Sequence, residues 1–360
     1  MYTALPDTHL RNRSKWLAAV GSTIGGLTLA GAALMAGNAL ADTSSDDAPV
    51  YGGELEGFEY PYPVQRFTFQ SQQQNLQMAY LDVAPEQPNG RTIVLMHGKN
   101  FCAATWQDSI ERLTKAGYRV IAPDQIGFCK SSKPQQYQFS FHQLAQNTHQ
   151  LLQQLDIDNV TVMGHSMGGM LASRYALMYP EQTQQLVLVN PIGLEDWKAK
   201  GVPYQSIDDA FAAEKQKTAE AIRSYQQSTY YVGDWKPAYD QWVEMLAGMY
   251  AGKDGEIVAW NQALTSDMVF TQPVVHEFEQ IQVPTLLLIG EQDNTAIGKA
   301  LASPEVQDTL GHYDVLGEQA AERIPDATLV EWPELGHSPH IQQPDEFHAA
   351  LLEGLQSIED

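Results

Sequence analysis

The sequence predicts an α/β protein with a mostly parallel sheet, helices on both faces of the sheet and an inserted helical cap. Three observations support this fold class. Apolar runs of strand length alternate with longer stretches at helical spacing, the runs are nearly continuous, and the alternation stops between residues 193 and 273. Continuous apolar runs are typical of parallel strands covered on both faces.

Six apolar runs predict strands, and four amphipathic stretches predict the helices that cover them. The expected strands are residues 91–96, 119–122, 160–163, 186–190, 285–289 and 328–332. The expected helices, in which apolar residues recur three and four apart, are residues 107–115, 141–155, 168–178 and 344–355.

The segment 193–272 is predicted to be a helical cap inserted into a core of residues 61–192 and 273–360. Its expected helical stretches are 208–230, 239–250 and 256–268. The cap is rich in aromatic and thioether side chains, most of which we expect in its own core, and they favour an apolar substrate. These side chains are Tyr225, Tyr230, Tyr231, Trp235, Tyr239, Trp242, Met245, Met249, Tyr250, Trp260, Met268 and Phe270.

Residues 1–41 have the layout of a signal peptide. Three basic residues precede the uncharged, apolar stretch 16–37, and small residues at 39 and 41 predict cleavage after Ala41. We therefore expect an exported protein, periplasmic or secreted. The alternative is an uncleaved leader, which would give the chain a transient membrane contact. Residues 42–60 are acidic and without periodicity, and are predicted to be a flexible lead-in with no function.

The composition of the chain disfavours nucleic acid and metal ions as binding partners. The chain has 360 residues, 43% of them hydrophobic, and a formal net charge of -23, which disfavours nucleic acid because phosphate is repelled. Two cysteines cannot form a thiolate metal site, and the histidines and carboxylates show no recurring ligand spacing. We expect no metal and no cofactor. The sequence does not indicate an oligomeric state.

A candidate nucleophile lies in the run 164–168, which reads Gly-His-Ser-Met-Gly. This G-x-S-x-G pattern directly follows an expected strand and precedes an expected helix, as a nucleophile elbow requires. The sharp turn would strain the backbone of Ser166 and raise its hydroxyl above the sheet. The helix N-terminus would also favour negative charge that develops beside it.

A serine hydroxyl needs a base oriented by a carboxylate. Asp293 lies in the turn after the strand 285–289, and His337 lies in the turn after the strand 328–332. Because the carboxyl ends of parallel strands share one edge of a sheet, these turns are expected to converge near Ser166. Glu291 and Asp314 are the reserve candidates for the acid.

The sequence resembles the cap-bearing branch of the α/β-hydrolase superfamily from about residue 67 to its end. The strand, His97-Gly98 and the following loop match the family's oxyanion loop, although Lys99-Asn100 replace its usual residues. The turn 124–131 is similar to the family's D-x-x-G-x-G-x-S, with Cys129 in place of a glycine. A long segment also separates Asp293 from His337, and 298–314 is expected to be an extra loop or helix.

This resemblance implies that Ser166 is the nucleophile, Asp293 the acid and His337 the base. It implies that the backbone N–H of Met167 is one oxyanion donor. The second donor is assigned to the backbone N–H of Lys99, with Asn100 as the neighbouring alternative. The Lys99 side chain itself is expected to face solvent.

The remaining histidines are expected to be structural. His97 and His165 flank the site without an evident carboxylate partner. His340 is expected at the entry of a helix, and His276, His312 and His348 are expected at surface or cap positions.

In the resembled fold, the loops that carry Cys102 and Cys129 are neighbours at one sheet edge. An exported protein is therefore expected to join them in a disulfide, and the alternative is two buried free thiols.

The function that these expectations favour is a serine hydrolase of carboxylic esters with an apolar acyl or alcohol part, acting through an acyl-enzyme. An amidase, a lactonase, a carbon–carbon bond hydrolase or an acyltransferase would use the same triad. A serine at the elbow argues against epoxide hydrolases and haloalkane dehalogenases, which use aspartate. A non-catalytic binding protein is the weakest alternative because no triad member is lost.

Overall fold

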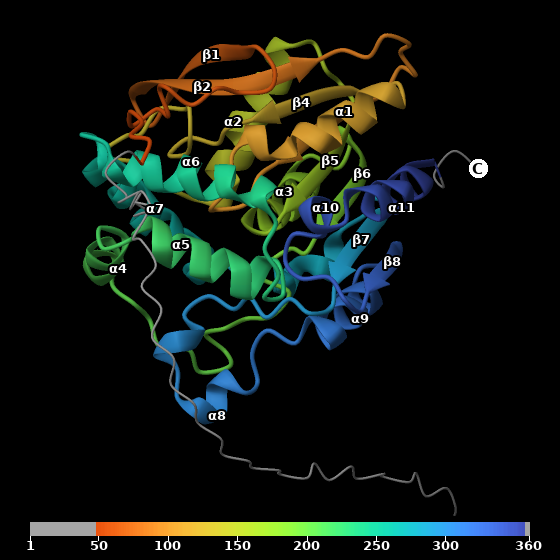
Figure 1. Cartoon of the computed structure of the whole chain (residues 1–360). Helices are drawn as coiled ribbons and strands as arrows, with labels where there is room; N and C mark the ends of the chain where they lie inside the picture. The colour runs from red at the N-terminus through yellow and green to blue at the C-terminus, as the bar shows by residue number, and fades with distance from the viewer. Residues whose placement is uncertain (1–47, 357–360) are drawn as a thin grey trace, which may run out of the picture. The chain divides into compact units, whose positions relative to one another are not determined.

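The computed structural model describes residues 48–356. They form one eight-stranded sheet with helices packed around it (Figure 1). The predicted signal peptide and its cleavage after Ala41 lie outside the described residues. The strands, in spatial order, are β1 (Val64–Ser71), β2 (Gln74–Val83), β4 (Arg119–Pro123), β3 (Thr92–Met96), β5 (Val160–His165), β6 (Thr183–Val189), β7 (Thr285–Gly290) and β8 (Ala327–Trp332). β2 pairs antiparallel with β1 and β4, and the other neighbours pair in parallel, so the predicted fold class is confirmed.

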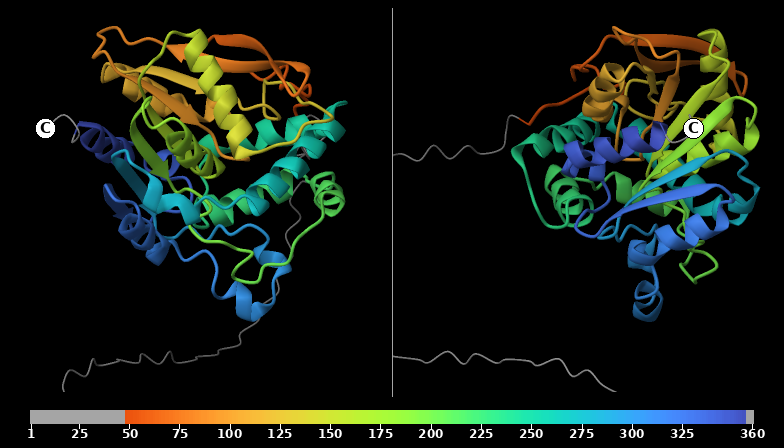
Figure 2. Two further views of the ribbon diagram at one scale, coloured as in Figure 1. Left: turned by 180° about the vertical axis from the view of Figure 1, so that it is seen from behind. Right: turned by 90° about the vertical axis from the view of Figure 1, so that its right-hand side faces the viewer.

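Helices cover both faces of the sheet, as can be followed in Figure 2. β7 shows why: Leu286 and Leu288 pack on one side and Leu287 and Ile289 on the other, so each face buries an apolar row. The first row packs with α1 (Gln107–Lys115) and α11 (Pro344–Gln356). The second packs with α2 (Phe141–Gln154), α3 (Met167–Met178) and α9 (Tyr313–Arg323).

The sequence did not indicate the hairpin of β1 and β2 at the sheet edge. Its turn is formed by Gln72 and Gln73, with φ of 48° and 62°, a left-handed geometry that Asn-Gly or Asp-Gly usually provides. β1 is also largely exposed and rich in glutamine. Neither the turn nor the strand therefore carries the usual hairpin signal.

The segment between β6 and β7 contains helices and no strand. Its helices are α4 (Ile207–Glu214), α5 (Ala219–Tyr225), α6 (Asp240–Ala251) and α7 (Gly255–Thr271), and a π-helical turn (Gln226–Tyr230) follows α5. The expected helix 208–230 is divided because Thr218 caps a new helix, its hydroxyl accepting from the Ala221 N–H at 3.1 Å. No helix in residues 48–356 is long and apolar enough to cross a membrane.

Residues 48–60 differ from the flexible lead-in that the sequence predicted. The Tyr51 N–H donates to the Gly248 carbonyl of α6 at 2.9 Å, and Leu55 is fully buried. The approach is so close that a Cβ on Gly252 would lie 2.0 Å from the Tyr51 carbonyl oxygen. These residues therefore pack against the cap, and their lack of periodicity reflects irregular structure rather than the absence of a role.

Cys102 and Cys129 form a disulfide, as expected, with their Cα atoms 5.8 Å apart. It joins the loop after β3 to the turn after β4. Cys129 has a φ of 46°, the left-handed conformation that glycine adopts most readily. Asp124 joins the same two loops, because its carboxylate accepts from the Ala103 N–H at 2.7 Å and the Lys130 N–H at 3.0 Å.

Replacing both cysteines by serine is expected to lower the free energy of unfolding by roughly 3 to 4 kcal/mol. The closed loop spans a sequence separation of 27, and its opening releases chain entropy in the unfolded state. Urea denaturation of the double variant measures the change, and wild type in reducing agent should reproduce it. Equal midpoints for oxidised and reduced wild type would contradict the prediction.

Candidate active site

Ser166 lies in a strained turn between β5 and α3. Its φ of 58° and ψ of −123° are unfavourable for a residue with a side chain. The turn is possible because its neighbours are glycines: a Cβ on Gly164 would lie 2.0 Å from the Gly168 carbonyl oxygen, and one on Gly168 would lie 2.0 Å from that of Met96. The G-x-S-x-G pattern thus has the geometry of a nucleophile elbow.

Asp293 and His337 meet at the carboxyl ends of β7 and β8. The His337 Nδ1 and an Asp293 carboxylate oxygen are 2.6 Å apart, and both side chains are almost fully buried. A carboxylate only accepts, so the proton of this bond belongs to Nδ1. The other ring nitrogen, Nε2, is left as the acceptor that a general base requires.

The free nitrogen of His337 has no hydrogen-bond partner within residues 48–356, and no hydrogen bond joins it to the Ser166 hydroxyl. His337 nevertheless lies next to the turn that carries Ser166, because it contacts the preceding residue, His165. The His165 Nε2 bonds the His337 carbonyl at 2.7 Å, and the centroids of the two imidazole rings are 4.8 Å apart. Catalytic hydrogen bonds are often long without substrate and shorten in the complex.

The loop after β3 lies against Ser166. A Cβ on Gly98 would be 2.9 Å from the Ser166 Cβ, so only glycine allows this approach. The backbone N–H groups of Lys99 and Met167 donate to no group in the described part of the chain. Two unpaired donors on either side of a serine are what an oxyanion hole requires.

Asn190 and Thr295 complete the surroundings of Asp293, and sequence reasoning did not single them out. Asn190 donates to Asp293 Oδ2 at 3.1 Å, while the hydroxyl and N–H of Thr295 donate to Oδ1 at 2.6 and 2.9 Å. Asn190 follows β6 directly, and a polar residue at the end of a buried strand was the available signal. These bonds orient the carboxylate toward His337.

The reserve candidates for the acid lie elsewhere. Asp314 is exposed at the first turn of α9, and Glu291 is half-buried. Neither hydrogen-bonds His337 in the described structure. The structure therefore brings Asp293, not Glu291 or Asp314, to the imidazole.

His97, His165 and His340, which surround the site, make local hydrogen bonds and packing contacts. His97 binds the Gly98 carbonyl through Nδ1 at 2.8 Å and accepts from the Gln125 N–H at 3.0 Å. His340 packs its ring against Trp106 and His165, at 4.8 and 4.6 Å between centroids. Burial holds the pKa of His165 and His340 well below the usual range, so both rings are neutral.

His276 and His312 are exposed as expected, whereas the prediction for His348 is wrong. His348 is buried, and its Nε2 bonds the Ser109 hydroxyl at 2.8 Å. It lies on the inner face of α11, where it contacts α1. The hydrogen bond could not be predicted from the sequence around His348, because Ser109 lies on a distant segment of the chain.

One cap residue, Tyr230, covers the His337 ring. Its ring stacks on the His337 ring with centroids 5.0 Å apart, and its hydroxyl accepts from the Asn100 amide at 2.8 Å. A Cβ on Gly336 would lie 2.8 Å from the Tyr230 carbonyl oxygen, so the cap and the loop that carries His337 are in close contact. The cap thus helps to exclude water from His337.

The prediction that the Lys99 side chain faces solvent is wrong. Its ammonium group is 2.9 Å from Glu214 Oε1 at the end of α4, and only 13% of its side chain is exposed. Lys217 binds the other oxygen of Glu214 at 2.7 Å. Burial lowers the pKa of Lys99 to about 8; burial raises that of Glu214, but the two lysines outweigh it and lower the Glu214 pKa to about 2.

Replacing Glu214 by glutamine is expected to cost about 2 to 4 kcal/mol of unfolding free energy at pH 7, because Lys99 loses its buried partner. The loss falls below that of a fully buried pair because Lys217 is partly exposed. The lowered pKa of Glu214 makes its contribution complete above about pH 4.5 and reduces it as the pH falls toward 2. Urea denaturation between pH 7 and pH 3 should therefore show the difference from wild type narrowing in acid, and a constant difference would contradict this.

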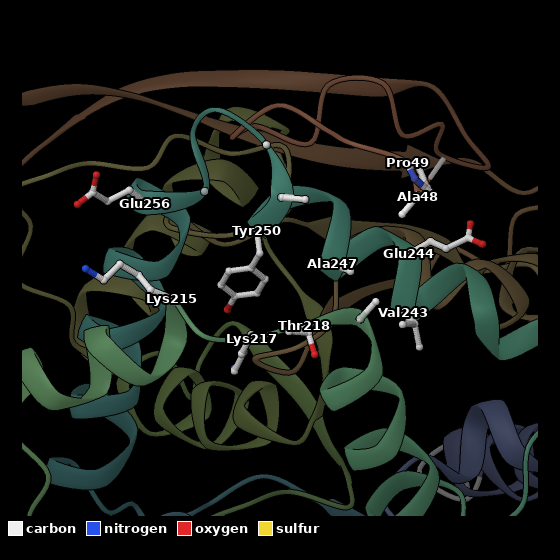
Figure 3. A pocket seen from close by; sticks show the side chains of 14 residues that line it. Ala48, Pro49, Lys215, Lys217, Thr218, Val243, Glu244, Ala247, Tyr250 and Glu256 are labelled. Atoms are coloured by element: carbon white, nitrogen blue, oxygen red, sulfur yellow. The ribbon is translucent and has the colours of Figure 1, made fainter. Parts of the chain in front are cut away.

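Two cavities lie beside this ion pair. The inner one, about 320 Å³, is lined by Lys99 and Asn100 of the loop after β3 together with cap residues such as Tyr225 and Ile222. The outer one, about 530 Å³, is shown in Figure 3, with Tyr250 at its centre. Tyr250 and Lys217 line both cavities and form their shared wall. The inner cavity therefore reaches the loop after β3, while Ser166 and His337 line neither cavity.

Comparison with known proteins identifies the family to which the chain belongs. Residues 91–344 match the model of the alpha/beta hydrolase fold family. A probable hydrolytic enzyme from Pseudomonas aeruginosa PAO1, of known crystal structure, is 65% identical with a TM-score of 0.85, over 86% of this chain and 99% of that one.

Two further relatives are more distant. Lipase 1 of Psychrobacter immobilis is 25% identical over 71% of this chain and 74% of its own length. The 2-hydroxy-6-oxo-6-phenylhexa-2,4-dienoate hydrolase of Burkholderia cepacia is 27% identical over 74% of this chain and 88% of its own length. The family model matches most of the chain, and the sheet carries a strained serine near a buried histidine–carboxylate pair. The chain therefore belongs to the α/β-hydrolase family and is a hydrolytic enzyme.

Proposed function

We propose that this enzyme is a serine hydrolase of carboxylic esters, with Ser166, His337 and Asp293 as its catalytic triad. The observation that carries the proposal is the state of His337. Its Nδ1 is held by a buried carboxylate, and its Nε2 is unpartnered among the described residues, beside a serine in a strained elbow. A base prepared in this way has the arrangement needed to activate a hydroxyl.

The reaction would run through an acyl-enzyme. His337 Nε2 takes the proton of the Ser166 hydroxyl as the oxygen attacks the ester carbonyl, and the N–H groups of Met167 and Lys99 hold the oxyanion. His337 then passes the proton to the departing alkoxide. A water molecule, deprotonated by His337, attacks the acyl-enzyme and releases the acid, which restores the Ser166 hydroxyl.

A carbon–carbon bond hydrolase is the second candidate, and one observation favours it. The Burkholderia cepacia relative described above is named as a hydrolase of a dienoate rather than of an ester. An amidase, a lactonase and an acyltransferase would use the same residues. The substrate therefore has to be decided by experiment.

Two measurements on the purified protein test the proposal. p-Nitrophenyl esters of graded acyl length should be hydrolysed, with highest kcat/KM at a chain length set by the inner cavity of about 320 Å³. A fluorophosphonate probe should label one peptide, the one that contains Ser166. Labelling elsewhere, or no turnover of any ester, would reject the assignment.

We also propose that the protein is exported, to the periplasm or the medium. The layout of residues 1–41 and the Cys102–Cys129 disulfide both support an oxidising compartment. The mature protein isolated from outside the cytoplasm should begin at Asp42. N-terminal sequencing checks this, and an intact leader on membrane-bound protein would contradict it.

A further inference from the structure

The inner cavity holds an excess of positive charge. Lys99 and Lys217 both bind the single carboxylate of Glu214, at 2.9 and 2.7 Å, and the Tyr250 hydroxyl donates to the same carboxylate at 2.5 Å. Two ammonium groups on one carboxylate leave one unbalanced charge. Both lysines line the cavity, so this charge faces a space that a ligand can enter.

The rest of this cavity is neutral. Its other walls are formed largely by apolar and aromatic side chains, among them Ile222 and Leu246 of the cap and Ile297 of the loop after β7. No further acidic residue lines it within the described part of the chain. A ligand of matching chemistry therefore has an apolar body and one negative group.

The chain's overall composition makes this local charge unusual. Acidic residues outnumber basic ones by 44 to 21, so a cluster in which lysines outnumber carboxylates departs from the average of the chain. Burial of Lys99 carries a cost, which is why its pKa falls to about 8. A second anion in the cavity would offset that cost and balance the cluster.

The cavity also reaches the loop after β3, which carries a proposed oxyanion donor, although Ser166 itself does not line it. Lys99 lines the cavity, and its backbone N–H is the proposed oxyanion donor in the loop whose Gly98 lies against Ser166. A substrate that extends from Ser166 into the cavity would therefore bring its carbonyl to the serine and its far end to the lysines.

We propose that the enzyme acts on esters that carry a carboxylate, and that Lys99 and Lys217 bind this carboxylate in the inner cavity. A monoester of a dicarboxylic acid has this chemistry on its acyl side, and an ester of a hydroxy acid has it on its alcohol side. The inference rests on the proposed function and narrows its substrate class. The carboxylate replaces no existing partner, because it balances the charge that Glu214 leaves over.

Two lysines provide a matched pair of variants. Lys217 lies beside the Tyr250 hydroxyl, whereas Lys215 is exposed and points away from it (Figure 3). Lys215 lines only the outer of the two cavities. Lys217→Met and Lys215→Met change the net charge of the protein equally, so a difference between them reports the site rather than the overall field.

Turnover is the first test. Wild type should hydrolyse monomethyl adipate, or the acetate ester of 6-hydroxyhexanoate, at least roughly tenfold better in kcat/KM than the matching ester without the carboxylate. Lys217→Met should remove most of this preference through KM, and Lys215→Met should keep it. No preference on either side of the ester, or equal losses in the two variants, would overturn the proposal.

Binding of free adipate, measured by calorimetry, separates this inference from the proposed function. Wild type and Lys215→Met should bind adipate alike, and Lys217→Met should bind it roughly tenfold more weakly. If no ester of any kind is turned over, the ester hydrolase assignment fails, and adipate binding still decides the anion site. If neutral esters are hydrolysed but adipate binds no more tightly than hexanoate, the site fails alone.

Discussion

Replacing Ser166 by alanine is expected to lower kcat for ester hydrolysis roughly 10⁴- to 10⁶-fold, since the proposed reaction has no other nucleophile. The remaining rate would come from the oxyanion donors and from binding alone. The substrate affinity should change little because the side chain lost is small. Burst and steady-state kinetics with a p-nitrophenyl ester measure kcat, and the fluorophosphonate probe should no longer label the protein.

A second variant at the same position, Ser166→Gly, separates catalysis from the strain of the elbow. It should be as inactive as the alanine variant. It should also be more stable than the alanine variant by about 1 kcal/mol, because glycine adopts a φ of 58° without steric cost. Urea denaturation provides this comparison. Substantial activity in either variant would show that another residue attacks the substrate.

The six parallel strands could be predicted because each is a nearly continuous apolar run between turn signals. β7 is the clearest case, as all six of its residues are buried. β1 could not, because it alternates weakly and turns through Gln72-Gln73 rather than through glycine. Sequence patterns identify strands that are buried on both faces better than solvent-exposed strands at the edge of a sheet.

The candidate triad could be predicted for a similar reason. Ser166, Asp293 and His337 each follow a recognisable strand, so topology alone brings their turns to one edge. Lys99 shows the limit of this reasoning. Its partner, Glu214, lies 115 residues away in the cap, and no local pattern relates the two. The cap's contacts with the core, including Tyr230 on His337, depend on packing between distant segments.

Replacing Asp293 by asparagine is expected to lower kcat roughly 10⁴-fold while leaving Ser166 and His337 in place. An amide can donate to His337, which would move the imidazole proton from Nδ1 to Nε2 and leave no base facing the serine. The kcat at neutral pH and the rate of fluorophosphonate labelling should fall together. The unfolding free energy should fall by about 1 to 3 kcal/mol, because the N–H groups of Asn190 and Thr295 lose a charged acceptor.

Glu291→Gln is the matched control for this prediction. Glu291 lies two residues before Asp293 in the same turn and loses the same charge on substitution, yet it makes no hydrogen bond to His337 in the described structure. It should therefore retain nearly full kcat and labelling. If Glu291→Gln were inactive and Asp293→Asn active, the bond of 2.6 Å between Asp293 and His337 would be structural, and the acid would have to be reassigned. The contrast between the two variants depends on the contact with the imidazole and not on the charge of the loop.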